Sequence, residues 1–340
     1  MKNTNCKPLI VAEISANHQQ NLEIAKKSIL MAKEAGADSV KIQSYDPSCL
    51  TLDSKSDIFQ IKSGLWKDKN LFELYKEAFL PWEWHSILFD YAKSIGIEIF
   101  STPFSQKALE VLEDLNCPRY KIASFELIDS FFIYEVAKTK KPIILSTGIA
   151  TEAEIQEAVL MCKKAGNNDI TLLQCTSEYP ASIAQANLLA MPNLGKTFGV
   201  KYGLSDHTLG NLCAVVATTL GASLIEKHFI IDKKLGGVDS AFSMDFEEFK
   251  LLVKDINDTI LSLGDGTIGR DEQAYKNQRS FARSLFVKKN IKAGEILSRE
   301  NIGSFRPYAG LHPKYLMQVL GKKAKRDLDF SKPLSFDDFE

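Results

Sequence analysis

The chain has 340 residues, of which 45% are apolar and 25% are charged, as in an ordinary globular protein. Its formal net charge of −1 argues against binding to nucleic acid or an anionic membrane, and no apolar run approaches the roughly 18–20 residues of a membrane span. The N-terminus, MKNTNCKPLI, lacks the layout of a signal peptide. The six cysteines, which form no CxxC pair, predict reduced thiols in a cytoplasmic protein: Cys6, Cys49, Cys117, Cys162, Cys175 and Cys213.

Short β-rich runs alternate with helical stretches from residue 9 to about residue 265. The eight strand-like runs are 9–15, 39–45, 98–104, 119–125, 142–148, 170–177, 202–207 and 223–229. Segments 21–36, 151–166 and 245–263 carry apolar residues on one helical face, and TEAE opens the second of them as a capping box. Eight such units predict a (β/α)8 TIM barrel. The alternative is a doubly wound open sheet, which often has a glycine-rich first turn, whereas this turn reads SANHQQN.

Two regions depart from the repeating pattern. An insertion at 46–80 follows the second strand, where barrel active sites form, and so predicts a substrate wall or lid; a surface excursion without a role is the alternative. The barrel is expected to occupy 1–266, followed by a polar linker at 267–283 and a small domain at 284–340. That domain is too short to bury much core alone, so we expect it to rest on the barrel or on another subunit.

Polar side chains stand near the carboxyl ends of the predicted strands, which in a parallel barrel face one shared site. Lys41 and Lys121 lie inside apolar strands, where a lysine is costly unless it meets an anion. Together with nearby hydroxyl groups, they predict a site for a small, strongly anionic ligand such as a phosphate ester with a carboxylate. For either lysine alone, an ion pair at the barrel mouth is the alternative.

His207 and His228 end the seventh and eighth predicted strands. Neighbouring strands lie about 4.8 Å apart, so two inward imidazoles at one level can share a metal ion. Such an ion keeps positions open for substrate and water, which suits Lewis-acid catalysis. Strand alternation turns Asp206 the other way and predicts a structural role for it. His85, inside a helical segment, is also expected to be structural, whereas His18 is undecided.

Two other functions fit the residues less well. A Schiff-base aldolase using Lys121 needs no metal, and the histidine pair argues against it. A non-catalytic ice- or carbohydrate-binding tail on a scaffold barrel leaves the buried lysines without a purpose.

Ordered motifs along nearly the whole chain resemble the sialic acid synthase family. They are VAEISANH, KIQSY, STPF, YKIASFE, STGIAT, CTSEYP, GLSDHT and EKHF. The tail, with KAGE and RPYAGLHP, resembles the antifreeze-like (SAF, β-clip) domain that ends these enzymes. Within the family, TLDSKSDIFQIKSGLW, LFELYKEA and PWEWH resemble the pseudaminic acid synthases rather than the N-acetylneuraminate synthases.

The resemblance implies an enzyme that condenses phosphoenolpyruvate with an open-chain acetamido sugar, with C–O cleavage, giving a nine-carbon 2-keto acid and phosphate. In the pseudaminic branch the sugar is 2,4-diacetamido-2,4,6-trideoxy-L-altropyranose. The alternative is an N-acetylneuraminate or legionaminate synthase using N-acetylmannosamine or a diacetamido mannose.

The resemblance also implies which residues hold phosphoenolpyruvate and the metal. Phosphoenolpyruvate is implied at Lys41, Thr102, Lys121, Ser124, Ser146 and Ser205. A divalent ion is implied at His207 and His228, with Mn²⁺ favoured and Mg²⁺ or Co²⁺ as alternatives.

Five further residues take implied roles. Glu13 is expected to orient substrate or shuttle a proton, and Asp239 is expected to lie near the metal and the sugar. Tyr179 is expected to line the sugar site. Ser177 stands where sialic acid synthases carry Asn, which weakens the case for N-acetylmannosamine. Arg306 is expected to reach into a partner's site in a domain-swapped homodimer.

Overall fold

The computed structural model describes residues 7–269, 273 and 275–340. Cys6 and part of the predicted linker (270–272 and 274) lie outside the described residues. The chain forms two compact units, Met1–Asp265 and Gly266–Glu340, each with an apolar core of its own.

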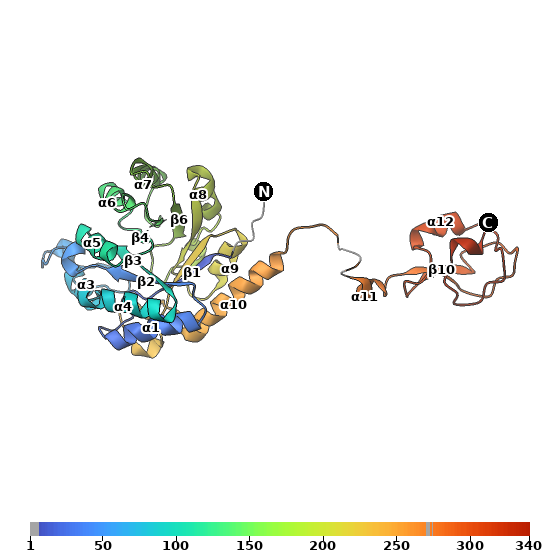
Figure 1. Cartoon of the computed structure of the whole chain (residues 1–340), viewed down its shortest axis with the longest axis horizontal. Coiled ribbons are helices and arrows are strands. Elements are labelled where there is room, and N and C mark those ends of the chain that lie inside the picture. Colours follow the sequence, from blue (N-terminus) through green and yellow to red (C-terminus); the bar gives the residue numbers. More distant parts are fainter. Residues whose placement is uncertain (1–6, 270–272, 274) are drawn as a thin grey trace. The chain divides into compact units, whose positions relative to one another are not determined.

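The first unit is a closed barrel of eight parallel strands (Figure 1). The strands are β1 (Leu9–Glu13), β2 (Ser39–Ser44), β3 (Glu98–Pro103), β4 (Tyr120–Ile122), β5 (Ile143–Ser146), β6 (Ile170–Cys175), β7 (Lys201–Asp206) and β8 (Leu224–His228). Each strand pairs with the next along the chain, and β1 closes the barrel against β8. The predicted TIM barrel is therefore confirmed, and each predicted run overlaps one of these strands.

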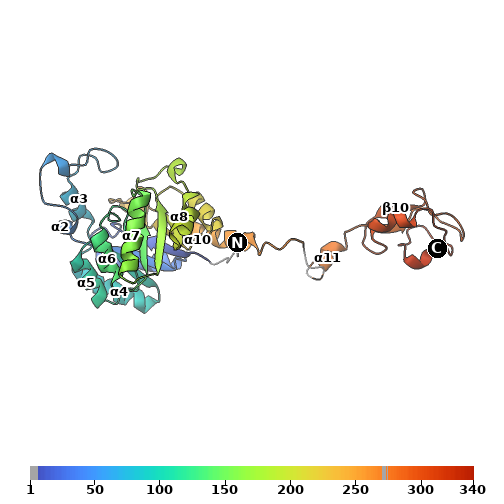
Figure 2. The same cartoon turned by 90° about the horizontal axis from the view of Figure 1, so that it is seen from above.

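Helices surround the strands (Figures 1 and 2). They are α1 (Leu22–Glu34), α2 (Pro47–Leu50), α3 (Leu71–Ala78), α4 (Trp82–Ile95), α5 (Gln106–Asp114), α6 (Ser130–Ala137), α7 (Glu152–Lys164), α8 (Ala190–Phe198), α9 (Leu212–Thr219) and α10 (Phe246–Leu263). The three predicted amphipathic segments are α1, α7 and α10. Thr151 and Glu154 form the predicted capping box of α7. None of the helices in the described part of the chain has both the length and the apolar character for a membrane crossing.

The barrel strands are covered on both faces. All five residues of β8 and all four of β5 are buried, as expected for parallel strands between a barrel interior and a helical layer. Buried helix residues such as Ile29 of α1 and Ile256 of α10 belong to the same apolar core as the strands. This packing fixes the strand ends, from which the polar side chains project.

The insertion predicted at 46–80 contains α2, a 3-10 turn at Asp57–Phe59, and α3. Figure 2 shows this segment, in blue, projecting beyond the ring of helices. It lies between β2 and α4, so it belongs to the loops at the carboxyl ends of the strands.

The second unit contains α11 (Lys276–Arg279), β9 (Ser284–Val287), β10 (Ile302–Phe305) and α12 (Leu316–Val319). Strands β9 and β10 pair in antiparallel orientation. The length of this segment predicted little core, but the unit buries ten apolar side chains: Leu285, Val287, Ile291, Leu297, Ile302, Val319, Ala324, Leu328, Leu334 and Phe339. Backbone hydrogen bonds between its loops, such as Leu334 N–H to Leu285 O, close the chain around that core.

Candidate active site

Four buried charged side chains, hereafter the mouth cluster, lie inside the barrel near the carboxyl ends of its strands. They are Glu13 of β1, Lys41 of β2, Lys121 of β4 and Glu226 of β8. Lys41 Nζ lies 2.5 Å from Glu13 Oε2 and 3.6 Å from Glu226 Oε1, and Lys121 Nζ lies 3.4 Å from Glu226 Oε1. None of the four exceeds 4% exposure. Four charges can be buried together because each ammonium faces a carboxylate.

The mouth cluster shifts the titration of its own members. Burial raises the pKa of Glu13 to about 7, although Lys41 opposes the change. Burial alone would also raise the pKa of Glu226, but Lys121 and Lys41 outweigh it and hold that pKa below its usual value. Burial lowers the pKa of Lys121. Near neutral pH, Glu13 can therefore exchange a proton while Glu226 remains ionised.

Hydroxyl groups extend the mouth cluster. Lys41 Nζ donates to Thr102 Oγ1 at 3.3 Å, and Ser205 Oγ donates to Glu226 Oε1 at 3.4 Å. Ser146 Oγ and Glu226 Oε2 are buried without a hydrogen-bond partner among the described residues. Buried polar atoms left in this state are costly. Both atoms can therefore form a hydrogen bond with a polar group that enters the mouth.

Ser124 and Ser177 form one wall beside these groups. Their hydroxyl oxygens lie 2.7 Å apart. A Cβ added at Gly148, in the loop after β5, would stand 2.2 Å from Ser177 Oγ and 3.2 Å from Ser124 Cβ. Only glycine lets the backbone approach the two serines this closely.

The two strand-end histidines face each other at the mouth. The ring centroids of His207 and His228 are 5.6 Å apart. His207 Nδ1 lies 2.8 Å from Thr176 O, and because a carbonyl only accepts, Nδ1 carries the proton and Nε2 keeps a free lone pair. His228 Nδ1 is buried, lacks a hydrogen-bond partner among the described residues, and lies 3.8 Å from Asp239 Oδ2.

Both rings are suited to bind a metal ion. Burial lowers the pKa of His207 to about 4 and that of His228 well below its usual value, so both imidazoles are neutral and can act as ligands. Among the described residues, no group of three or more His, Cys, Asp or Glu side chains is placed so that it could hold a metal ion. The pair therefore fits an ion that takes its remaining ligands from water and substrate.

Three aromatic side chains, hereafter the aromatic wall, flank the histidines: Trp66, Tyr179 and Phe242. Tyr179 packs against His207 with centroids 4.3 Å apart, and Phe242 packs against His228 at 4.8 Å. Trp66 contacts both Tyr179, at 5.7 Å, and Phe242, at 6.4 Å. These residues come from the loops after β2, β6 and β8, so the wall joins three separate loops.

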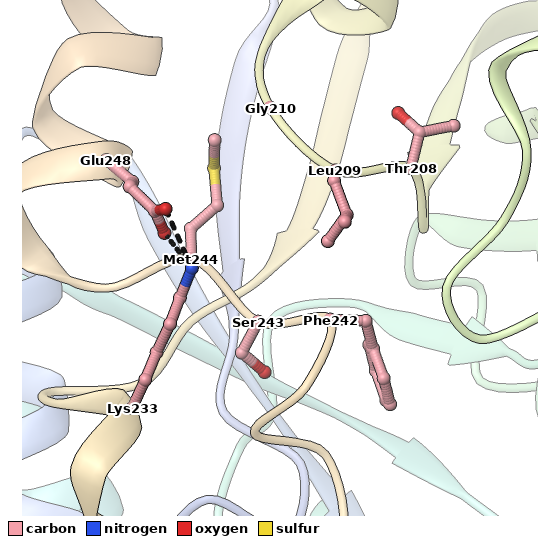
Figure 3. A pocket seen from close by; sticks show the side chains of 8 residues that line it. All are labelled: Thr208, Leu209, Gly210, Lys233, Phe242, Ser243, Met244 and Glu248. Atoms are coloured by element: carbon pink, nitrogen blue, oxygen red, sulfur yellow. Dashed lines mark hydrogen bonds and ion pairs between the residues drawn. The ribbon is translucent and has the colours of Figure 1, made fainter. Parts of the chain in front are cut away.

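A small hollow of about 110 Å³ lies next to the ends of β7 and β8 (Figure 3). The Lys233–Glu248 ion pair forms part of its lining, as does Phe242. Pockets for drug-sized ligands usually hold roughly 300–1,000 Å³. The hollow is too small for phosphoenolpyruvate together with an acetamido sugar. The polar barrel mouth is therefore the better candidate for the substrate site.

A second buried ion pair lies directly beside the histidines in sequence. Lys227 Nζ lies 2.7 Å from Asp206 Oδ2 and also donates to Thr208 O and, at 2.8 Å, to Gly210 O. Both side chains are only 1% exposed. The expected structural role of Asp206 agrees with this pairing. Likewise His85, buried in α4, bonds to Ser44 Oγ at 2.8 Å.

Twelve of the thirteen predicted site residues belong to the barrel unit, where they lie in the strands or in the loops that follow them. The exception is Arg306, which follows β10 in the C-terminal unit and is exposed. Sequence reasoning missed a role for Glu226, although alternation placed it on the same strand face as His228. It also missed Trp66, Phe242 and Gly148, which lie in loops without a periodic pattern.

Comparisons with known proteins cover both units. The NeuB family matches residues 28–268, and the SAF domain matches residues 282–340. A pseudaminic acid synthase from Helicobacter pylori is 55% identical over 98% of each chain. An N,N'-diacetyllegionaminic acid synthase from Campylobacter jejuni is 37% identical and covers 94% of this chain and 97% of its own. A solved N-acetylneuraminic acid synthetase from Leptospira borgpetersenii superposes with a TM-score of 0.71 at 29% identity, over 81% of this chain and 92% of that one.

Proposed function

Because the chain belongs to the NeuB family of sialic acid synthases, we propose that it is a pseudaminic acid synthase that joins phosphoenolpyruvate to 2,4-diacetamido-2,4,6-trideoxy-L-altropyranose. The family predicted from the motifs is confirmed, as is the C-terminal SAF domain. The observation that carries the reaction is a buried cluster of two lysines beside two neutral histidines. The choice of sugar is supported by the 55% identity to a pseudaminic acid synthase, against 37% to a legionaminic acid synthase.

Phosphoenolpyruvate binds at the mouth cluster in this proposal. The ammonium groups of Lys41 and Lys121 offset the charges of its phosphate and carboxylate, and charge-assisted hydrogen bonds of this kind are strong. Ser146, without a partner in the described structure, gains an acceptor. Thr102, Ser124, Ser177 and Ser205 supply further hydroxyls. Glu13 and Glu226 balance the lysines within the chain, so neither buried ammonium group is unpaired.

The reaction forms one C–C bond and breaks one C–O bond. C3 of phosphoenolpyruvate attacks the sugar aldehyde carbon, and the carbonyl electron pair moves to the aldehyde oxygen, which takes up a proton. Water then adds at C2 and loses a proton, and cleavage of the C–O bond releases phosphate and the 2-keto acid. His207 and His228 would hold a divalent ion, which when bound would supply Lewis-acid polarisation of the aldehyde. Glu13, whose pKa is about 7, is suited to move a proton at this oxygen, and Asp239 lies beside His228 to orient substrate.

Phosphate release from a panel of sugars tests this function. The purified protein, supplied with Mn²⁺ and phosphoenolpyruvate, is expected to release phosphate with the diacetamido altrose. N-acetylmannosamine and the diacetamido mannose are expected to give far slower release. Release with one of those two sugars and not with the altrose would reassign the enzyme to the N-acetylneuraminate or legionaminate synthases.

Mn²⁺ is the ion assigned to His207 and His228 in this proposal, with Mg²⁺ and Co²⁺ as alternatives. His207→Ala is expected to remove tight Mn²⁺ binding, measured by electron paramagnetic resonance, and to abolish turnover while the barrel still unfolds cooperatively. His85→Ala, which alters a buried histidine of α4 outside the mouth, is the control for metal binding. Full activity of His207→Ala in the presence of EDTA contradicts the assignment.

The SAF unit completes the site of a second copy in this proposal. Its Arg306 is exposed and so is available to a partner's anionic substrate, as the family resemblance implies for a domain-swapped homodimer. Arg306→Ala and Glu13→Ala are each expected to be nearly inactive, whereas verified heterodimers of the two regain part of the activity because one intact site forms. Heterodimers without activity contradict the swap.

The five described cysteines are all free thiols, in keeping with the cytoplasm as the proposed compartment.

A further inference from the structure

Trp66 connects the long insertion, which follows β2, to the loop that follows β8. Its indole N–H donates to Val238 O at 3.1 Å, in the loop after β8, although the two residues are 172 positions apart. The flanking residues Leu65 and Lys67 are exposed, whereas Trp66 is half-buried. Within residues 62–69 of the insertion, only Trp66 turns inward, and its hydrogen bond holds the indole in place.

The aromatic wall extends outward from the histidines in two steps. Tyr179 and Phe242 contact the imidazole rings directly, and Trp66 contacts Tyr179 and Phe242. No ring contact joins Trp66 to either histidine among the described residues. If the sugar aldehyde reacts beside His207 and His228, the far end of its carbon chain reaches the level of Trp66.

We propose that Trp66 is the specificity-determining residue for the far end of the sugar, where it selects a methyl group at C6 over a hydroxymethyl group. This inference rests on the proposed function. Trp66, Tyr179 and Phe242 offer a broad apolar surface there, in contrast to the charged mouth cluster, and Trp66 already directs its one polar hydrogen to Val238 O. A C6 hydroxyl placed against these rings loses its hydrogen bonds to water and finds none in exchange.

The expected discrimination is moderate. Apolar pockets reject an added hydroxyl by roughly 100-fold at most, because the pocket itself leaves no polar group unpaired. The unaltered enzyme is therefore expected to prefer the 6-deoxy sugar, by kcat/KM, over its 6-hydroxy analogue by roughly 10- to 100-fold.

The experiment compares these two sugars in three variants. Trp66→Ala removes the ring and is expected to lower kcat/KM for the 6-deoxy sugar and to bring the ratio between the sugars close to one. Trp66→Phe keeps a ring but loses the bond to Val238 O, and is expected to retain most of the ratio. Leu65→Ala, at an exposed neighbour on the same segment, is the matched control and leaves both rates unchanged. The KM for phosphoenolpyruvate is expected to stay constant throughout, which shows that the mouth cluster is intact.

The outcomes separate this inference from the proposed function. If the unaltered enzyme turns over the 6-deoxy sugar but Trp66→Ala slows both sugars equally, Trp66 only holds the insertion in place and the specificity role is overturned. Unchanged kcat/KM values for both sugars in Trp66→Ala overturn the specificity role as well. If the unaltered enzyme uses neither of these diacetamido sugars, the proposed function itself fails.

Discussion

Strand β8 carries a buried charge on each of its faces, Glu226 on one and Lys227 on the other, and the surroundings of these two charges differ. Asp206 and Lys227 form a pair in which the ammonium has three acceptors, Asp206 Oδ2, Thr208 O and Gly210 O. Glu226, one position from Lys227, belongs to the mouth cluster instead. Its contacts to Lys41 and Lys121 are 3.4–3.6 Å long, and its second oxygen has no hydrogen-bond partner among the described residues.

The Asp206–Lys227 pair and the mouth cluster therefore have different consequences for stability and for ligand binding. A saturated buried pair cannot be broken without leaving an unpaired charge, so it stabilises one arrangement of the chain. Lys41 and Glu13 lie close together in the mouth cluster, but Glu226 is held at longer distances and keeps one oxygen without a partner, so this side of the cluster can form further hydrogen bonds. The first arrangement holds the ends of the two strands that lead to His207 and His228, and the second is the proposed binding site.

Exchanging Lys227 for methionine gives the largest expected effect. Lys227→Met leaves Asp206 buried and unpaired and frees the carbonyls of Thr208 and Gly210, so the free energy of unfolding is expected to fall by about 3–5 kcal/mol. Urea unfolding followed by tryptophan fluorescence measures it, because Trp66, Trp82 and Trp84 all lie in the barrel unit.

The double variant Asp206→Leu/Lys227→Met serves as the control for unpaired charge. It removes both charges and is expected to recover much of the lost stability. A single variant as stable as the unaltered protein shows that the pair is not the structural element described above.

The matched exchange within the mouth cluster is expected to act on activity instead. Lys121→Met leaves Glu226 paired with Lys41 and Ser205, so stability changes little. It removes one cation from the anion site, and kcat/KM for phosphoenolpyruvate is expected to fall roughly 10²- to 10³-fold. Steady-state kinetics and the same urea titration measure both quantities. A large loss of stability with an unchanged KM for phosphoenolpyruvate contradicts the assignment.

The contrast between Lys227 and Lys121 also shows how much of these charge pairs could be predicted from the sequence. The cost of a lysine inside an apolar strand predicted an anion near Lys41 and Lys121, and both lie against carboxylates. The same argument applies to Lys227 in SLIEKHF, and Asp206 in GLSDH is available as its partner. Strand alternation turns both side chains away from the barrel interior, and Asp206 lies opposite Lys227 in the register of β7 and β8. Together these two features predict the ion pair.

Other parts of the site depend on contacts that no local pattern records. Trp66 and Val238 are brought together only when the barrel closes, because they follow β2 and β8. The close approach of Gly148 to Ser177 likewise needs the positions of two separate loops. Periodicity predicts which strands form and which face each residue takes, whereas the loops that line the mouth are placed by tertiary packing.

The C-terminal unit repeats the saturated design around one carboxylate, and the smallest effect is expected there. Asp338 is buried and accepts from Arg326, Lys332 and Ser335, whose hydrogen bonds outweigh burial and lower the pKa of Asp338 to about 2. Because this pKa is lower in the folded chain than in the unfolded chain, its stabilisation is complete above about pH 4 and is lost as the pH falls towards 2. Arg326 and Lys332 are partly exposed, so the contribution is on the order of 1–2 kcal/mol.

Pepsin cleavage within residues 284–340, followed by mass spectrometry, tests this dependence in the full chain. Asp338→Asn is expected to be cleaved faster than the unaltered protein at pH 4–5, because the charged acceptor is missing. The difference is expected to shrink steadily towards pH 2, the folded-state pKa, where about half of Asp338 is itself protonated. Asp337→Asn, at the neighbouring exposed aspartate, is the matched control and should follow the unaltered protein. A ratio of cleavage rates that does not change with pH shows that the carboxylate of Asp338, unlike that of Asp206, contributes nothing as a charge.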